Sequence, residues 1–235
     1  MGWPAPDQRG VDVVYKLRPM PAVVRTFEEA GQRLVLRDAG THHELLLGQV
    51  PILSSAALGT ERTFGELAGS LAGASARRVL IGGLGFGATL RGALSALGPD
   101  AEVIVVEKLA TVVDLLRGEL SSLAEGCLDD PRARLVQDDV AEVIDRERGL
   151  DVILLDVDNG PGWASFRANA RLYAPDGLRR AREALRPGGA LAVWSGYPAD
   201  AFTGQLRRAG LTPSVVPLKE RGVVRARAYV GKAPG

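Results

Sequence analysis

The chain contains almost no cysteine and no apolar run long enough to cross a membrane. Cys127 is the single cysteine among 235 residues, which excludes an intrachain disulfide and a Cys-x-x-Cys metal or redox motif. The longest apolar runs, such as Val103–Val106, are much shorter than the ~18 residues that span a bilayer. The first residues also lack a basic stretch followed by an apolar one. We therefore expect a cytoplasmic location.

The chain also lacks an excess of positive or negative charge. Lys and Arg number 29 against 28 Asp and Glu, which leaves a formal net charge of +1. A charge this small does not favour nucleic acid or an anionic membrane as a partner. The hydrophobic share of 46% and the charged share of 24% are typical of globular proteins and exclude a disordered or fibrous chain. We expect a small-molecule substrate, no nucleic-acid or membrane partner, and no metal site.

The pattern of apolar residues changes near residue 55. Before it, short Val- and Leu-rich runs are separated by turn residues, which predicts a small antiparallel β-strand region over residues 1–55. The strands expected there are Val11–Leu17, Val23–Phe27, Arg33–Arg37 and Glu44–Leu47. From Thr60 onward, short apolar runs alternate with stretches of helical period, which is typical of a parallel sheet with crossover helices.

Residues 56–235 are therefore predicted to form an α/β domain with a seven-stranded, mostly parallel sheet. Its central strands are apolar almost throughout, as strands covered on both faces must be. Apolar residues between Val112 and Leu123 recur at three- and four-residue steps and predict one amphipathic helix, and a second helix is expected over Ala201–Ala209. The predicted strands are Arg78–Ile81, Glu102–Glu107, Arg134–Gln137, Val152–Asp156, Ala190–Trp194, and an antiparallel hairpin of Ser214–Leu218 and Val223–Val230.

Three closely spaced glycines follow the strand that ends at Ile81. Glycine is needed where the chain turns sharply or where the backbone approaches a ligand closely. Gly83, Gly85 and Ala88 fit the Gly-x-Gly-x-x-Gly/Ala pattern of dinucleotide-binding enzymes. Gly83, Gly85 and Gly87 fit equally well the Gly-x-Gly-x-Gly pattern of S-adenosylmethionine enzymes. A tight turn that binds no ligand is the third interpretation.

Acidic residues at the ends of the next two strands favour a nucleoside ligand. Glu107 ends the second strand, where a carboxylate can accept hydrogen bonds from both ribose hydroxyls, and Lys108 follows it. The alternative for Glu107 is a solvated charge after a strand. The third strand is followed by Asp138 and Asp139. Either carboxylate can accept a hydrogen bond from an adenine amino group, and the competing interpretation is an N-cap for the next helix.

Short motifs between residues 76 and 195 follow one another in a characteristic order. They are Ile81 to Gly87, Val105-Val106-Glu107, Asp129 to Arg132 followed by Gln137-Asp138, Asp151 to Asp156, Leu172-Tyr173, and Ala184 to Gly189. In this order they resemble the class I S-adenosylmethionine-dependent methyltransferases, and within them the spermidine-synthase-like branch. The resemblance implies a Rossmann-like class I methyltransferase fold with helices on both faces of the sheet, and S-adenosylmethionine as cofactor.

A weaker match lies upstream of these motifs. His43-Glu44 followed by Val50-Pro51-Ile52 is similar to the His-Glu and Val-Pro-Leu elements that precede the core of polyamine aminopropyltransferases, with one more residue between them here. The resemblance implies that the early strands lie over the cofactor pocket and that Gln49 reaches the nucleoside. It also implies a homodimer, because members of this branch commonly form dimers.

The chain departs from spermidine synthases in two motifs. Their glycine turn carries an Asp that holds the ammonium of the aminopropyl group, and Gly85 stands at that position here. After the fourth strand they carry Asp-Ser-x-Asp-Pro, of which this chain keeps Asp156 but has Asn159 in place of the second Asp, with Asp158 displaced. Because a polycation needs several anionic contacts to offset its lost hydration, these departures disfavour polyamine synthesis.

Transfer from a sulfonium is an in-line displacement in which the protein positions the nucleophile and, where necessary, removes its proton. Asp156, at the carboxyl end of a central strand, is the first candidate for a base or an orienting acceptor. Capping of the following loop is its structural alternative. Asp158, Tyr197 and His43 are further candidates, because each lies in a segment expected near the mouth of the pocket.

Three hypotheses about function result. The main one is an S-adenosylmethionine-dependent methyltransferase that acts on an N or O nucleophile of a small molecule. The second is an aminopropyltransferase that uses decarboxylated S-adenosylmethionine. The third is a nucleoside-binding partner protein without turnover, which the scarcity of obvious catalytic groups would explain.

Overall fold

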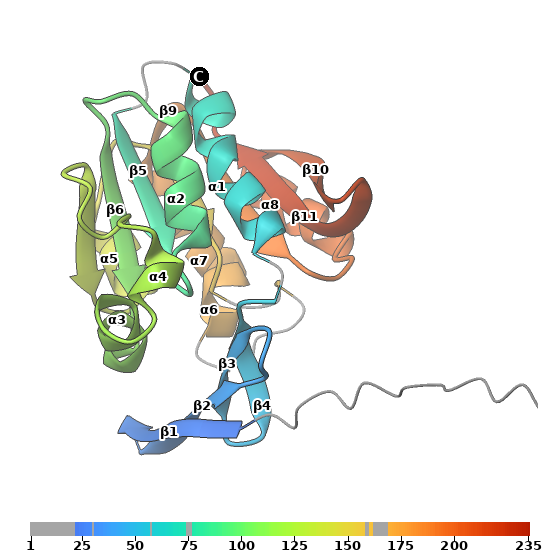
Figure 1. Cartoon of the computed structure of the whole chain (residues 1–235). Coiled ribbons are helices and arrows are strands. Elements are labelled where there is room, and N and C mark those ends of the chain that lie inside the picture. Colours follow the sequence, from blue (N-terminus) through green and yellow to red (C-terminus); the bar gives the residue numbers. More distant parts are fainter. Residues whose placement is uncertain (1–21, 30, 57, 74–76, 158–159, 162–168) are drawn as a thin grey trace, which may run out of the picture.

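The computed structural model describes residues 22–29, 31–56, 58–73, 77–157, 160–161 and 169–235. These residues form a small sheet and a larger sheet flanked by helices (Figure 1). The predicted strand Val11–Leu17 lies outside the described residues. In the described part of the chain, no helix combines the length and the apolar character that crossing a membrane requires.

The small sheet is antiparallel and contains four strands in sequence order. They are β1 (Ala22–Glu29), β2 (Gln32–Asp38), β3 (His43–Leu47) and β4 (Val50–Ser54). Leu34, Leu36 and Leu45 of this sheet are buried in the main core. The strand β4 was not predicted because Pro51 weakens a strand pattern, and β4 is an edge strand, where proline is tolerated.

The larger sheet has seven strands in the order β10-β11-β9-β8-β5-β6-β7, which confirms the predicted Rossmann-like fold class. Strands β5 to β9 run parallel, whereas β10 and β11 form an antiparallel hairpin at one edge. The strands are β5 (Arg78–Gly82), β6 (Glu102–Glu107), β7 (Ala133–Gln137), β8 (Leu150–Leu155), β9 (Leu185–Ser195), β10 (Thr212–Glu220) and β11 (Val223–Lys232). All six residues of β8 are buried, as expected for a strand covered on both faces.

Helices cover both faces of the larger sheet (Figure 1). On one face lie α1 (Gly59–Ala72), α2 (Ala88–Ala96), α3 (Ala110–Arg117) and α4 (Ser121–Ala124). On the other lie α5 (Val140–Arg146), α6 (Ala170–Tyr173), α7 (Pro175–Ala184) and α8 (Ala201–Arg208). The prediction of one helix between Val112 and Leu123 was wrong. Gly118 has non-helical dihedral angles and its N–H caps the carbonyl of Asp114 at 2.9 Å, so α3 ends before α4 begins.

Glycines allow α1 and α2 to pack at backbone contact. A β-carbon on Gly65 of α1 would lie 2.0 Å from the carbonyl oxygen of Thr89, and one on Gly92 of α2 would lie 2.0 Å from that of Arg62. Any side chain at either position would force the helices apart. This close approach brings the first turn of α1 beside the first turn of α2.

The small sheet covers the carboxyl ends of the parallel strands. In Figure 1 it lies below the larger unit, next to α3 and α6. The carboxylate of Glu29, at the end of β1, accepts hydrogen bonds from the N–H groups of Ala110 (2.6 Å) and Thr111 (3.0 Å) in the first turn of α3. A carboxylate at a helix N-terminus satisfies free N–H groups and opposes the positive end of the helix dipole. This contact ties the β1–β2 hairpin over the end of β6.

Candidate active site

A cavity of about 310 Å³ lies where β5, β6 and β8 end. Its polar lining includes Glu107 from the end of β6, Asp156 after β8, and Gln32 from the small sheet. The backbone of Gly83 and Gly85 forms another part of the wall. The apolar lining consists of Ile52, Leu53, Val106, Leu109, Val112, Val140 and Val157. This volume is at the lower end of the range for small-ligand pockets, and the carboxyl edge of an open parallel sheet is the usual place for one.

Glu107 is held rigidly at the edge of this cavity. Its Oε2 accepts the N–H of Leu84 at 3.0 Å, and its Oε1 accepts the N–H of Leu109 at 2.8 Å. Burial raises the pKa of Glu107, and these backbone hydrogen bonds oppose the rise. The backbone N–H groups of Lys108 and Gly85 also act on this carboxylate. A carboxylate at the end of this strand is the usual acceptor for the hydroxyls of a ribose.

The three glycines of the turn have different roles. Gly83 has φ +92°, and a β-carbon there would lie 2.2 Å from the carbonyl oxygen of Asp156, so only glycine fits. Gly85 also has a positive φ and lines the cavity. Gly87 does not line it. Gly87 is the left-handed N-cap of α2 and faces the buried thiol of Cys127.

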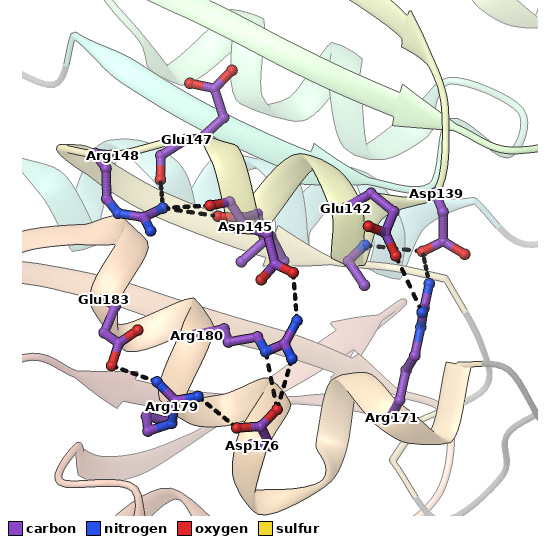
Figure 2. Close-up of polar contacts among 12 residues, drawn as sticks. Asp139, Glu142, Asp145, Glu147, Arg148, Arg171, Asp176, Arg179, Arg180 and Glu183 are labelled. Carbon is purple, nitrogen blue, oxygen red and sulfur yellow. Dashed lines mark hydrogen bonds and ion pairs between the residues drawn. The ribbon is translucent and has the colours of Figure 1, made fainter.

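Asp138, Asp139 and Lys108 also line the cavity, but both carboxylates have protein partners. Asp139 accepts an N–H from the first turn of α5 and pairs with Lys108 Nζ at 2.9 Å. It also pairs with Arg171 at 2.9 Å (Figure 2). Burial opposes ionisation, yet these donors lower the pKa of Asp139. Asp138 pairs with an arginine of α5 at 2.7 Å. Asp139 is therefore the N-cap of α5, and Arg171 links that cap to α6.

A second cavity of about 230 Å³ adjoins the first. Ile52, Leu53, Gly85, Asp156 and Val157 line both cavities. Glu61, Thr89 and Trp194 line only the second of the two. The described residues around the second cavity include no lysine, arginine or histidine. Asp156 therefore lies at the junction between the cavity lined by Glu107 and an acidic cavity.

The second cavity is lined by two carboxyl groups with raised pKa values, Asp156 and Glu61. Burial raises the pKa of Asp156 to about 6, opposed by the hydroxyl of Thr89, which donates to Oδ2 at 2.5 Å. Burial and the charge of Asp156 raise the pKa of Glu61 to about 7. Thr89 Oγ1 also lies 3.2 Å from the carbonyl oxygen of Glu61. At neutral pH the pair thus carries between one and two negative charges.

The structure does not bring the other predicted residues to these cavities. His43 lies in β3, where its N–H donates to Ser55 Oγ at 2.9 Å, and it lines neither cavity. Tyr197 is 54% exposed and lines neither cavity. Gln49 borders a separate depression on the small sheet, lined also by Val23 and Arg33. Asp158 lies outside the described residues.

Gln32 and Glu61 are among the polar residues of the cavities that were not identified from the sequence. Gln32, rather than Gln49, reaches the first cavity from the small sheet, and only the docking of the β1–β2 hairpin distinguishes the two glutamines. Glu61 lies in the first turn of α1, where an acid is common because it opposes the helix dipole. From the sequence, Glu61 is explained by its position in the first turn of a helix, and no pattern indicates that it lines a cavity.

The strand order and the helices on both faces correspond to the Rossmann-like α/β fold of spermidine synthases. The crystal structure of spermidine synthase from Thermotoga maritima superposes with a TM-score of 0.69 at 21% sequence identity, covering 91% of this chain and 73% of that one. No family model matches the chain. The predicted fold and the predicted resemblance to this branch are confirmed.

Curated relatives of known name are also polyamine aminopropyltransferases. Polyamine aminopropyltransferase 2 of Pseudomonas aeruginosa is 37% identical over 122 residues, which cover 50% of this chain and 33% of the relative. The polyamine aminopropyltransferase of Aeropyrum pernix is 35% identical over 121 residues, covering 49% of this chain and 36% of the relative. The chain thus spans about a third of the length of these two relatives.

These relatives overturn the main hypothesis from the sequence. Their names state aminopropyl transfer, so the prediction of a methyltransferase acting with intact S-adenosylmethionine was wrong. The error came from counting anionic groups only in the glycine turn and after the fourth strand, where Gly85 and Asn159 replace carboxylates. The folded chain places a further carboxylate, that of Glu61, in the second cavity.

Proposed function

We propose that the protein transfers an aminopropyl group from decarboxylated S-adenosylmethionine to a primary amine. The observation that carries this proposal is the junction of the two cavities at Asp156: one is lined by the carboxylate of Glu107, and the other is acidic without a described basic residue. Similarity to polyamine aminopropyltransferases supports the same chemistry.

The first cavity suits the nucleoside part of the donor. Glu107 accepts hydrogen bonds from the ribose hydroxyls, and Val112 and Val140 provide apolar surface for the adenine ring. Gly83 and Gly85 let the donor approach the backbone without an intervening side chain. The sulfonium then lies toward Asp156, at the entrance to the second cavity.

The second cavity suits the acceptor amine. Its nitrogen attacks the methylene carbon bonded to the sulfonium, a C–N bond forms, and the C–S bond breaks with its electron pair passing to sulfur. The products are the N-aminopropyl amine and methylthioadenosine. The carboxylate of Asp156, whose pKa of about 6 leaves it mostly ionised at pH 7, orients the amine and takes the proton that nitrogen loses.

Incubation with decarboxylated S-adenosylmethionine and putrescine tests this proposal. Methylthioadenosine should appear only when both are present, and Asp156→Asn should lower the rate about 10²–10⁴-fold. Asp100→Asn, an exposed change far from either cavity lining, is the matched control and should leave the rate unchanged. Absence of methylthioadenosine release with putrescine, cadaverine and spermidine would contradict the proposal. Tight donor binding without product would instead favour the nucleoside-binding partner protein.

A further inference from the structure

The carboxylate of Glu61 lies in the acidic cavity without a basic side chain to balance it. Its only hydrogen-bond donor from a side chain is the hydroxyl of the adjacent Thr60, at 3.0 Å, among the described residues. The other charged groups that act on it are carboxylates, Asp156 and Glu220, which repel it. A partly buried carboxylate in such surroundings is costly for the free protein and becomes favourable when a cation binds.

The proposed donor brings a cation of this kind. Decarboxylated S-adenosylmethionine carries a primary ammonium at the end of its aminopropyl chain, in addition to the sulfonium. The glycine turn offers that ammonium no carboxylate, because residue 85 is glycine. In the proposed reaction Asp156 interacts with the attacking amine. A second carboxylate is therefore required to bind the ammonium of the donor.

Packing of α1 against α2 places Glu61 where this anion is needed. The close contact at Gly65 and Gly92 brings the first turn of α1 to Thr89, whose hydroxyl lies at hydrogen-bond distance from both Asp156 and the carbonyl of Glu61. Glu61 and Gly85 line the same cavity. Glu61, in the first turn of a helix, thus lines the same cavity as Gly85 of the glycine turn.

We propose that Glu61 binds the ammonium of the donor's aminopropyl group and thereby selects decarboxylated over intact S-adenosylmethionine, an inference that rests on the proposed function. Intact S-adenosylmethionine carries an additional carboxylate next to that ammonium. Glu61 and Asp156 would repel this carboxylate inside a cavity with no described basic residue. The same pair therefore attracts one donor and disfavours the other.

Calorimetric titration at pH 8 with decarboxylated S-adenosylmethionine and with methylthioadenosine, which lacks the ammonium, tests the inference. Glu61→Gln should weaken binding of the decarboxylated donor about 10–100-fold, the range for loss of one charge-assisted contact. Binding of methylthioadenosine should change less than about twofold, which also shows that the variant is folded. Glu66→Gln removes an exposed carboxylate of the same helix that pairs with Arg62, and should change neither affinity.

A double variant tests whether a carboxylate at another position of the cavity can replace that of Glu61. A β-carbon at Gly85 would meet only Leu53 Cδ2, at 3.5 Å, and aspartate tolerates the left-handed conformation at φ +49° better than most residues. Gly85→Asp in the Glu61→Gln background should therefore recover at least part of the lost affinity for the decarboxylated donor. Rescue of this kind is not expected if Glu61 only supports the fold.

The outcomes separate failure of the inference from failure of the proposed function. Equal weakening of both ligands by Glu61→Gln, or unchanged binding of the decarboxylated donor, overturns the role of Glu61 even if the enzyme releases methylthioadenosine. A wild-type preference for intact S-adenosylmethionine overturns the selectivity. If the wild-type chain binds neither nucleoside, both the proposed function and the inference are wrong.

Discussion

Replacing Glu61 by glutamine should make the ligand-free protein more stable at alkaline pH. At that pH the wild-type carboxylate is ionised although it is partly buried and close to another carboxylate, Asp156. The pKa of Glu61 is about 7 in the folded chain against an ordinary value of 4.5. The gap between these two pKa values corresponds to about 3 kcal/mol of unfolding free energy. Glutamine has the size of the protonated side chain and cannot ionise, so it avoids this cost.

The sign of the pH dependence follows from the raised pKa. Between pH 4.5 and 7 the folded state binds more protons at Glu61 than the unfolded state does, so the stability that Glu61 contributes is full below 4.5 and is lost as the pH rises through 7. The stability difference between Glu61→Gln and wild type should therefore be less than about 1 kcal/mol at pH 5. It should rise to about 3 kcal/mol at pH 8, or about 6–12 °C in the midpoint of thermal unfolding.

Urea unfolding of both proteins without ligand, at pH 5 and pH 8, measures this difference. Glu66→Gln on the same helix serves as control, and its effect should stay within about 0.5 kcal/mol at both pH values because Glu66 is exposed. A Glu61→Gln protein that is less stable than wild type at pH 8 would refute the reasoning. So would a stability difference that does not change between the two pH values.

Three further predictions concern Glu107 at the end of β6, Gly83 in the glycine turn and Asp151 at the start of β8. Glu107→Gln should weaken methylthioadenosine binding about 10–100-fold in calorimetry, because it removes the charged acceptor from the first cavity. Gly83→Ala should lower the free energy of unfolding by about 2–4 kcal/mol in urea, since its β-carbon would lie 2.2 Å from the carbonyl of Asp156 at a φ of +92°. Asp151→Asn should cost about 2–3 kcal/mol at pH 7, because buried Asp151 accepts N–H groups of Arg77 and Arg78, each at 2.9 Å. Burial opposes ionisation of Asp151, yet these donors lower its pKa. The greater stability of the wild type over Asp151→Asn should therefore be lost as the pH falls through that lowered pKa. Acid titration of the unfolding free energy of both proteins measures this loss.

The fold was predictable because each element carries its own periodic signal. Strands such as Glu102–Glu107 are apolar on both faces wherever helices cover the sheet, and the structure has this strand with the predicted bounds. The exceptions have local causes. Gly118 divides a segment whose apolar period alone predicts one helix, and Pro51 weakens the pattern of β4.

The position of the first cavity follows from the sequence for a related reason. Gly83, Glu107 and Asp156 each come at or just after the carboxyl end of a parallel strand, and parallel neighbours bring those ends to one edge. The order of the motifs along the chain is thus enough to predict that they line one cavity. Tyr197 and His43 lie near strand ends too, but local order does not indicate which way their segments point.

The sequence by itself determined the sheet, its order of motifs and the residues along its carboxyl edge, because periodicity and strand direction are local properties of the chain. Only the tertiary structure decided that Gln32 instead of Gln49 reaches the first cavity and that Glu61 lines the second cavity together with Asp156. Those positions depend on how the small sheet is tied to α3 through Glu29 and how α1 packs on α2 through glycine contacts. Such contacts join segments far apart in the chain, and no periodic pattern records them.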